Sequence, residues 1–294
     1  MKRHSFSSFA VLGALLALPA LAQEPAARPA GAPGVHEPAG HPTEVDTALA
    51  KAREGLLAGE PDGAAHEQLV QAIRAGFGGI GAQAPGSTAV RARLVAAVDD
   101  LFARAKHAKI APDELTALHV DVLDARALES LAQCAQKPGK EGLAAVESAV
   151  KELDEASRTL DPESSDWRER ARKLLGTLGG KDSILTADLA PLEETLAQAR
   201  CLRAEALLEK HATSAGAAAT DFARARNAVS DLLEPQMARD PTARDAKQKL
   251  VSAIDELEQR SHSSRLERAD FESLRSELAL RTRAPVVEGL PAHG

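Results

Sequence analysis

The spacing of apolar residues between positions 44 and 282 most constrains the fold of this chain. Along this stretch Ala, Leu, Val and Ile recur three and four residues apart, and no segment sustains strict alternation of apolar and polar residues. Spacing of three and four places side chains on one stripe of a helix, whereas a half-buried strand needs alternation. The breaks between these segments carry Gly and Pro, which end helices. The sequence therefore predicts an all-α protein of about ten helices.

Several of the predicted helices resemble one another at a regular distance. RLVAAVDDL at 93–101 returns as KLVSAIDEL at 249–257, and IAPDELTALHVDVLDAR at 110–126 returns as ILTADLAPLEETLAQAR at 184–200. A more divergent third copy of the latter is LERADFESLRSELALR at 266–281. The matches indicate a repeat of 74 to 82 residues, a length that accommodates three helices.

The repeat aligns three apolar trios, one in each copy. They are Leu115, Leu118 and Val122; Leu189, Leu192 and Leu196; and Phe271, Leu274 and Leu278. Because the members of a trio stand three or four residues apart, each trio forms a stripe along which helices of a bundle interlock. The pairs Asp161-Pro162 and Asp240-Pro241, 79 residues apart, each predict an N-cap followed by proline at the first helical position.

These alignments divide the chain into three tandem three-helix units. The predicted ranges are 62–136 for unit 1, with helices near 64–77, 88–107 and 113–136, then 139–211 for unit 2 and 216–283 for unit 3. Residues 44–58 remain as a leading helix that caps an otherwise exposed apolar edge. The units stack either as bundles or as one solenoid, and residues 284–294 form a disordered tail.

The first 22 residues have the pattern of a secretory signal peptide. Basic residues Lys2 and Arg3 precede the apolar run FAVLGALLAL at 9–18, and Ala20-Leu21-Ala22 forms an A-x-A cleavage site. The sequence predicts an exported protein, periplasmic or secreted, that begins at Gln23 and does not insert into the membrane. Loss of the signal peptide changes the formal net charge from −7 to −9, which argues against nucleic acid as a partner.

Residues 23–43 hold five of the sixteen prolines and almost no large apolar residue, so they predict a disordered linker. Within the linker, His36-Glu37 is followed by His41, one residue beyond the spacing of the zinc-binding pattern H-E-x-x-H. Pro38 and Gly40 disfavour the helix that such a site needs. We interpret the segment as a solvated tail, with weak adventitious metal capture as the alternative.

Gly76, Gly78 and Gly81 have the spacing G-x-G-x-x-G of a dinucleotide-binding loop. Such a loop must leave a β-strand and enter a helix, because its glycines hold a turn against the helix N-terminus. Here a predicted helix precedes the motif, and the repeat places the motif in a connector between helices. We therefore interpret it as a helix end, with Gly78 or Gly79 as the left-handed residue.

The sequence identifies no catalytic, cofactor-binding or metal-binding residues. None of the nine histidines has a glutamate three residues before it, and no two helical histidines stand three or four apart, as di-iron and helical zinc sites require. Trp167 is interpreted as a core or helix-staple residue, with a binding anchor as the alternative. His107 and His119 are interpreted as solvated or locally hydrogen-bonded.

Cys134 and Cys201 are expected to be free thiols. The repeat aligns Cys134 with Leu208, which lies seven residues, or about 10 Å, from Cys201 along the equivalent helix. That offset exceeds the reach of a disulfide unless equivalent helices in successive units run in opposite directions.

Three functional hypotheses are compatible with these patterns. The favoured one is an exported helical-repeat protein that binds another protein, because repeated helices mainly create surface. The second is a carrier or ligand-binding bundle with a cavity between helices, and the third is an enzyme without a recognisable motif. The charge of the mature chain favours a partner with basic features.

Overall fold

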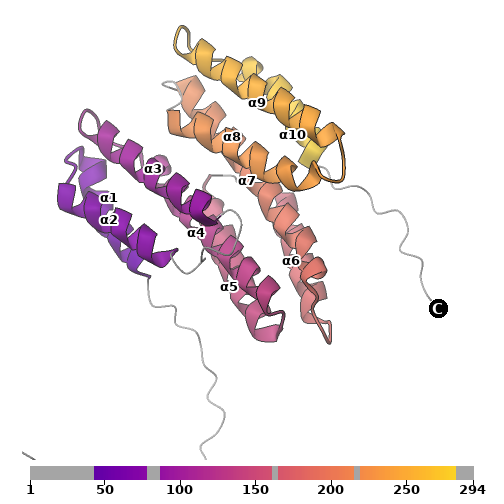
Figure 1. Ribbon diagram of the computed structural model, residues 1–294. Coiled ribbons are helices and arrows are strands. Elements are labelled where there is room, and N and C mark those ends of the chain that lie inside the picture. Colours follow the sequence, from indigo (N-terminus) through magenta and orange to yellow (C-terminus); the bar gives the residue numbers. More distant parts are fainter. Residues whose placement is uncertain (1–42, 78–86, 161–164, 215–218, 283–294) are drawn as a thin grey trace, which may run out of the picture. The chain divides into compact units, whose positions relative to one another are not determined.

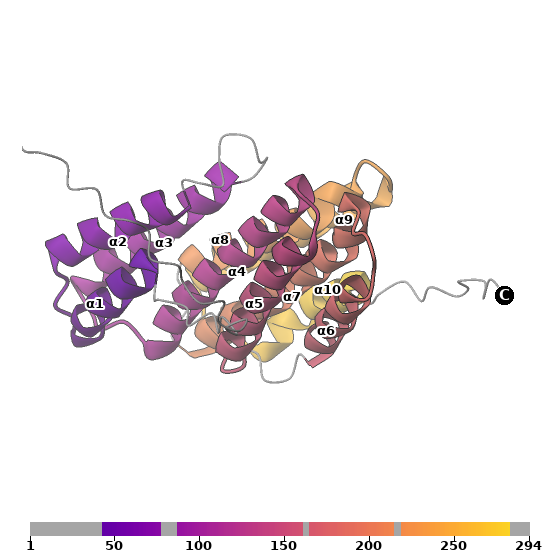
Figure 2. The same cartoon turned by 90° about the horizontal axis from the view of Figure 1, so that it is seen from below.

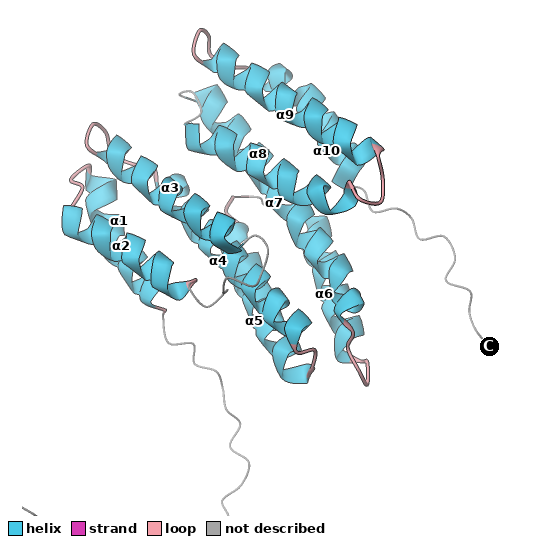
Figure 3. Ribbon diagram, in the orientation of Figure 1, coloured by secondary structure: helices cyan, strands magenta, loops and turns pink. Residues whose placement is uncertain are grey.

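The structure is a computed structural model that describes residues 43–77, 87–160, 165–214 and 219–282. Within these ranges all regular secondary structure is helical, as Figure 3 shows, which confirms the predicted all-α class and the predicted number of helices. The α-helices are α1 Glu44–Ala58, α2 Gly63–Gly76, α3 Ser87–Ala105, α4 Pro112–Gln136, α5 Lys140–Ser157, α6 Ser165–Gly179, α7 Thr186–Ser214, α8 Ala219–Leu233, α9 Thr242–Ser261 and α10 Glu272–Thr282. Two 3-10 helices, η1 Glu234–Gln236 and η2 Arg268–Phe271, precede α9 and α10. None of the helices in these ranges has the length and apolar character needed to span a membrane.

Local signals explain the ends of α1. Thr43, the last residue of the predicted linker, is instead the N-cap, and its side chain accepts a hydrogen bond from the Asp46 amide while Asp46 accepts from the Thr43 amide. This reciprocal pair satisfies amides that the first helical turn leaves free. At the other end Gly59 adopts φ 75°, the left-handed conformation that glycine tolerates best.

Gly76, the first glycine of the G-x-G-x-x-G pattern, is the last residue of α2. A Cβ at this position would lie 2.9 Å from Val45 Cγ2, so the missing side chain permits α2 to pack closely on α1. The pattern therefore begins in a helix that packs on another helix. Gly78, Gly79 and Gly81 lie outside the described residues, as do the predicted signal peptide, residues 23–42 of the linker, the Asp161-Pro162 pair and the predicted tail.

The helices enclose three apolar cores that follow one another along the chain (Figure 1). The first core lies among α1, α2, α3 and α4, the second among α4, α5, α6 and α7, and the third among α7, α8, α9 and the η2–α10 segment. Each apolar trio identified in the sequence is buried in a different core. Figure 2 shows the same helices from below.

The long helix α4 contributes to two cores because it carries two apolar stripes. Leu115, Leu118, Val122 and Ala125 lie in the first core. The second core contains Val120, Leu123, Ala127, Leu131 and Cys134 of the same helix. Both sets are spaced by three and four residues, which defines two faces of one helix. The second stripe departs from the sequence analysis, which placed 113–136 in unit 1 alone.

The helix α7 repeats this arrangement between the second and third cores. Leu189, Leu192, Leu196 and Ala199 lie in the second core. The third core contains Ala197, Cys201, Ala204, Leu208 and Ala212. The last helix α10 begins six residues after the start of the third repeat copy at 266–281, and its residues Leu274 and Leu278 contribute to the third core alone.

The start of α9 has the cap that the Asp240-Pro241 pair predicts, but the helix begins one residue later than predicted. The helix begins at Thr242, whose amide donates a 2.9 Å hydrogen bond to Asp240 Oδ1. Pro241 already has helical backbone angles, with φ −56° and ψ −30°. The Asp-Pro pair therefore supplies the expected cap, and the difference lies within the usual uncertainty of a helix boundary.

Because only one face of α10 is buried, replacing two leucines that stand two residues apart should have unequal effects on the free energy of unfolding. Leu278 is 3% exposed and Leu280 is 65% exposed. Because Leu278→Ala opens a cavity in the third core, it should lower the free energy of unfolding by about 2 to 5 kcal/mol. The control Leu280→Ala should change it by no more than about 0.5 kcal/mol. Urea denaturation followed by circular dichroism measures both, and equal effects would contradict this packing.

Candidate functional site

A cavity of about 350 Å³ lies between α3, α4, α7 and α8. Its aliphatic lining is Val90, Leu94, Ala96, Ala97, Ala125, Leu128, Ala219 and Ala223. Its charged lining is Arg93, Asp100, Asp121, Asp124, Arg200, Arg224 and Asp231, to which Thr220 and Asn227 add uncharged polar groups. The cavity therefore combines an apolar surface with charges of both signs.

Ion pairs join all four helices around this cavity. Arg93 of α3 lies 2.8 Å from Asp231 of α8, and Arg200 of α7 contacts the same carboxylate at 3.1 Å. Arg200 Nε also lies 3.5 Å from Asp124 of α4, whose other partner is Arg203 of α7 at 2.6 Å. Burial opposes the charge of Arg200, but Asp124 and Asp231 more than compensate and raise its pKa above the usual range.

Asp124 and Arg203 form the most deeply buried of these pairs, at 5% and 3% exposure. A charge taken out of water needs a close counter-ion and hydrogen bonds, and this pair supplies both between α4 and α7. Three atoms of the cluster nevertheless remain buried without a hydrogen-bond partner among the described residues: Asp124 Oδ1, Arg200 Nη2 and Arg203 Nη1. Such atoms carry a desolvation cost of about 1 to 3 kcal/mol each.

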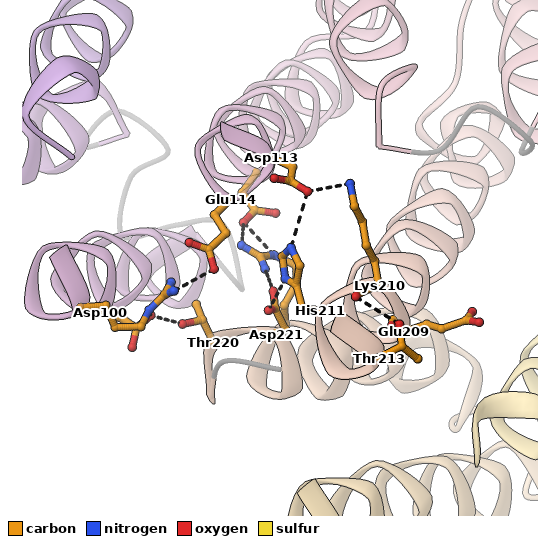
Figure 4. Close-up of polar contacts among 12 residues, drawn as sticks. Asp100, Asp113, Glu114, Glu209, Lys210, His211, Thr213, Thr220 and Asp221 are labelled. Atoms are coloured by element: carbon orange, nitrogen blue, oxygen red, sulfur yellow. Dashed lines mark hydrogen bonds and ion pairs between the residues drawn. The ribbon is translucent and has the colours of Figure 1, made fainter. Parts of the chain in front are cut away.

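A second polar cluster lies at the C-terminal end of α7, and Figure 4 shows it. His211 Nδ1 lies 2.7 Å from Asp221 Oδ2 of α8, and His211 Nε2 lies 3.8 Å from Asp113 of α4. Lys210 contacts Asp113 at 2.6 Å, and Arg224 contacts Asp221 at 2.6 Å. The hydrogen bond to Asp221 raises the pKa of His211 above 6.5, while burial acts in the opposite direction.

A further contact joins the two walls of the cavity. The Thr220 hydroxyl at the start of α8 donates to Asp100 of α3 (Figure 4). Asp100 also contacts Arg104 at 2.8 Å. Together with the Arg93–Asp231 pair, this bond connects α3 to α8 through polar groups. The two helices belong to different apolar cores, α3 to the first and α8 to the third.

The residues singled out in the sequence lie away from the cavity. Trp167 is buried in the second core, in agreement with its interpretation as a core residue. The guanidinium groups of Arg168 and Arg203 lie 5.1 and 5.4 Å from its ring centroid. His107 is exposed. His119 lies within α4 with Nε2 4.0 Å from Asp46, and burial lowers its pKa.

The two cysteines are buried free thiols in different cores, Cys134 in the second and Cys201 in the third. Burial raises the pKa of Cys201 to about 12. At neutral pH this thiol is therefore protonated and a poor nucleophile. Among the described residues, no three His, Cys, Asp or Glu side chains are grouped so that they could hold a metal ion.

The charged cluster has no contiguous signature in the sequence, because its members come from four helices. Arg93, Asp124, Arg200 and Asp231 are separated by up to 138 residues, and no short motif links them. One local signal was present: Asp124 stands between Leu123 and Ala125, which belong to the two apolar stripes of α4. A charged residue between two buried neighbours needs a partner on a packed helix.

No family model matches the sequence, and comparisons with curated proteins and with solved structures found no match. The cavity offers hydrogen-bond donors and acceptors around an aliphatic space, an arrangement suited to binding.

The Asp124–Arg203 pair predicts a large effect when one partner is removed. Arg203→Met leaves a buried carboxylate with a single 3.5 Å contact to Arg200, and should cost about 3 to 5 kcal/mol of stability. The double variant Asp124→Leu/Arg203→Met should recover part of this loss. In the control Lys249→Met, which breaks a pair whose lysine is 66% exposed, the loss should not exceed about 1 kcal/mol. Denaturant unfolding measures all three, and similar losses for Arg203→Met and Lys249→Met would contradict the role of burial.

His211 predicts a pH-dependent contribution to stability. Because its pKa is raised above 6.5, the charged contribution is complete below pH 6.5 and is lost as the pH rises through the folded-state value. The stability difference between the wild-type protein and His211→Gln should therefore be larger at about pH 5.5 than at about pH 9. Asp221→Asn should reduce this difference, since Asp221 is the main cause of the shift. A difference that grew with pH would contradict the assignment.

Proposed function

We propose that the protein is an exported helical-repeat protein of the cell envelope that binds another protein and is not an enzyme. The observation that carries the proposal is the succession of three cores joined by the shared helices α4 and α7. Such an array extends surface along the chain.

The proposal includes three tandem three-helix units, at 62–136, 139–211 and 216–283. Support comes from the trios Leu115–Leu118–Val122, Leu189–Leu192–Leu196 and Phe271–Leu274–Leu278, each of which is buried in its own core. In this scheme α1 completes the first core as α4 completes the second and α7 the third. A unit that cannot bury its apolar face alone gains stability from its neighbour, as in stacked repeats.

Export is proposed from the signal-peptide pattern of residues 1–22. We expect the N-terminal residue of the protein in its native cells to be Gln23, and Ala22→Leu to slow cleavage because the site requires small residues. Mass spectrometry of the intact protein from fractionated cells tests both expectations. Recovery of the protein with Met1 in the cytosolic fraction would contradict export.

Protein binding is tested by photo-crosslinking in the native cells. A photoreactive amino acid at Leu185 or Leu280, which are 62% and 65% exposed, places the probe on the surface without disturbing a core. The expected result is a reproducible adduct with one protein, which then binds the purified chain saturably, and which is absent for a variant lacking residues 1–22. Substrate turnover that is lost on a single Asp or His substitution, with the fold intact, would contradict the binding proposal.

A second candidate function is small-molecule binding, and the cavity between α3, α4, α7 and α8 favours it. Its volume of about 350 Å³ falls at the lower end of the range of ligand pockets. Its lining also has the composition of such pockets, with aliphatic side chains and a few polar groups that can fix orientation.

A further inference from the structure

We propose that the cavity between α3, α4, α7 and α8 binds a zwitterionic aliphatic amino acid. This inference rests on the second candidate function, small-molecule binding. It adds the chemical class of the ligand, which three properties of the lining residues indicate: their apolar surface, their unpaired polar atoms and their balance of charge.

The apolar part of the lining favours a ligand with an aliphatic side chain. Eight of the lining side chains are Ala, Val or Leu, and none of the described lining residues is aromatic. A planar ring would find no partner for stacking here, whereas a branched aliphatic chain can contact Leu94, Ala97 and Leu128. The volume of about 350 Å³ restricts the ligand to a small molecule.

The unpaired atoms select the head group. Arg200 Nη2 is a donor and Asp124 Oδ1 an acceptor, and both are buried without a hydrogen-bond partner among the described residues. Their side chains are neighbours, with Arg200 Nε 3.5 Å from Asp124 Oδ2. Because each atom is covered by its neighbours, a ligand reaches it only when the two side chains rotate toward the cavity that they line. The carboxylate and ammonium groups of an amino acid share one carbon and are equally close, so after that rotation the carboxylate can accept from Arg200 while the ammonium donates to Asp124.

The charges of the lining favour a zwitterion over an ion. Arg93, Arg200 and Arg224 are all paired with carboxylates, and Asp100 and Asp124 have the further partners Arg104 and Arg203. A lone carboxylate or a lone ammonium group would add an uncompensated charge to this paired cluster. A zwitterion adds charges of both signs and leaves the balance unchanged.

Four compounds that share a branched aliphatic chain test whether binding needs both the ammonium and the carboxylate group. They are leucine, isocaproate without the ammonium group, isoamylamine without the carboxylate, and the neutral isocaproamide. Isothermal titration calorimetry of the full mature chain should show saturable binding of leucine, and affinity lower by at least about tenfold for each of the other three. An analogue that binds as tightly as leucine would overturn the zwitterion proposal.

Two alanines of α3 provide a matched pair of variants that locate the site. Ala96 and Ala92 are both exposed, but only Ala96 lines the cavity. Ala96→Phe should fill the space and weaken leucine binding by at least about tenfold, whereas Ala92→Phe should leave it unchanged. Equal binding by the two variants would overturn the location, provided that circular dichroism shows both to be folded.

A thermal-shift screen of lipids and metabolites distinguishes a wrong ligand class from the absence of any small-molecule binding. If leucine does not bind but another compound does, and Ala96→Phe abolishes that binding, small-molecule binding holds and the zwitterion assignment is wrong. If no compound binds in either assay, both are wrong. The proposal of protein binding is decided independently by the crosslinking experiment.

Discussion

The packing of apolar side chains on two faces of α4 and α7 is the constraint on which the other helices depend. Each of these helices presents one stripe to one core and a second stripe to the next, so a change in either helix reaches two cores. The helices α2, α3, α5 and α6 each serve one core. Close packing on both faces restricts how far α4 and α7 can move relative to their neighbours.

The contact between α4 and α7 differs in character from the cores on either side of it. Asp124, Arg200 and Arg203 place buried charges where the two helices meet, and the cavity opens beside them. Buried ion pairs often add little net stability compared with apolar residues of the same volume, although in some proteins buried polar groups fix the register of packed helices. We therefore attribute stability to the apolar stripes, and alignment of the two helices and the proposed ligand binding to the charged cluster.

The sequence predicted the helices well because their determinants are local. The range 44–58 coincides with α1, since Thr43 caps its start and Gly59 ends it. The first stripe of α4 was recognised from Leu115, Leu118 and Val122, whose size makes the periodicity plain. The second stripe has the same spacing and contains residues as large as Leu123 and Leu131, but it was missed because the repeat aligns only one trio in each helix. The cavity and its ion pairs were not predictable, because Arg93 and Asp231 meet only once the intervening helices have folded.

The most direct test of whether α4 and α7 couple neighbouring cores is amide hydrogen exchange in a variant whose single substitution lies in the second core. Val146 is fully buried on α5 and belongs to that core alone. In Val146→Ala we predict faster exchange along α4 and α7 as well as α5, including amides of residues such as Leu118 and Leu208 that face the first and third cores. Faster exchange restricted to α5 and α6 would show that the cores are independent and would contradict the account.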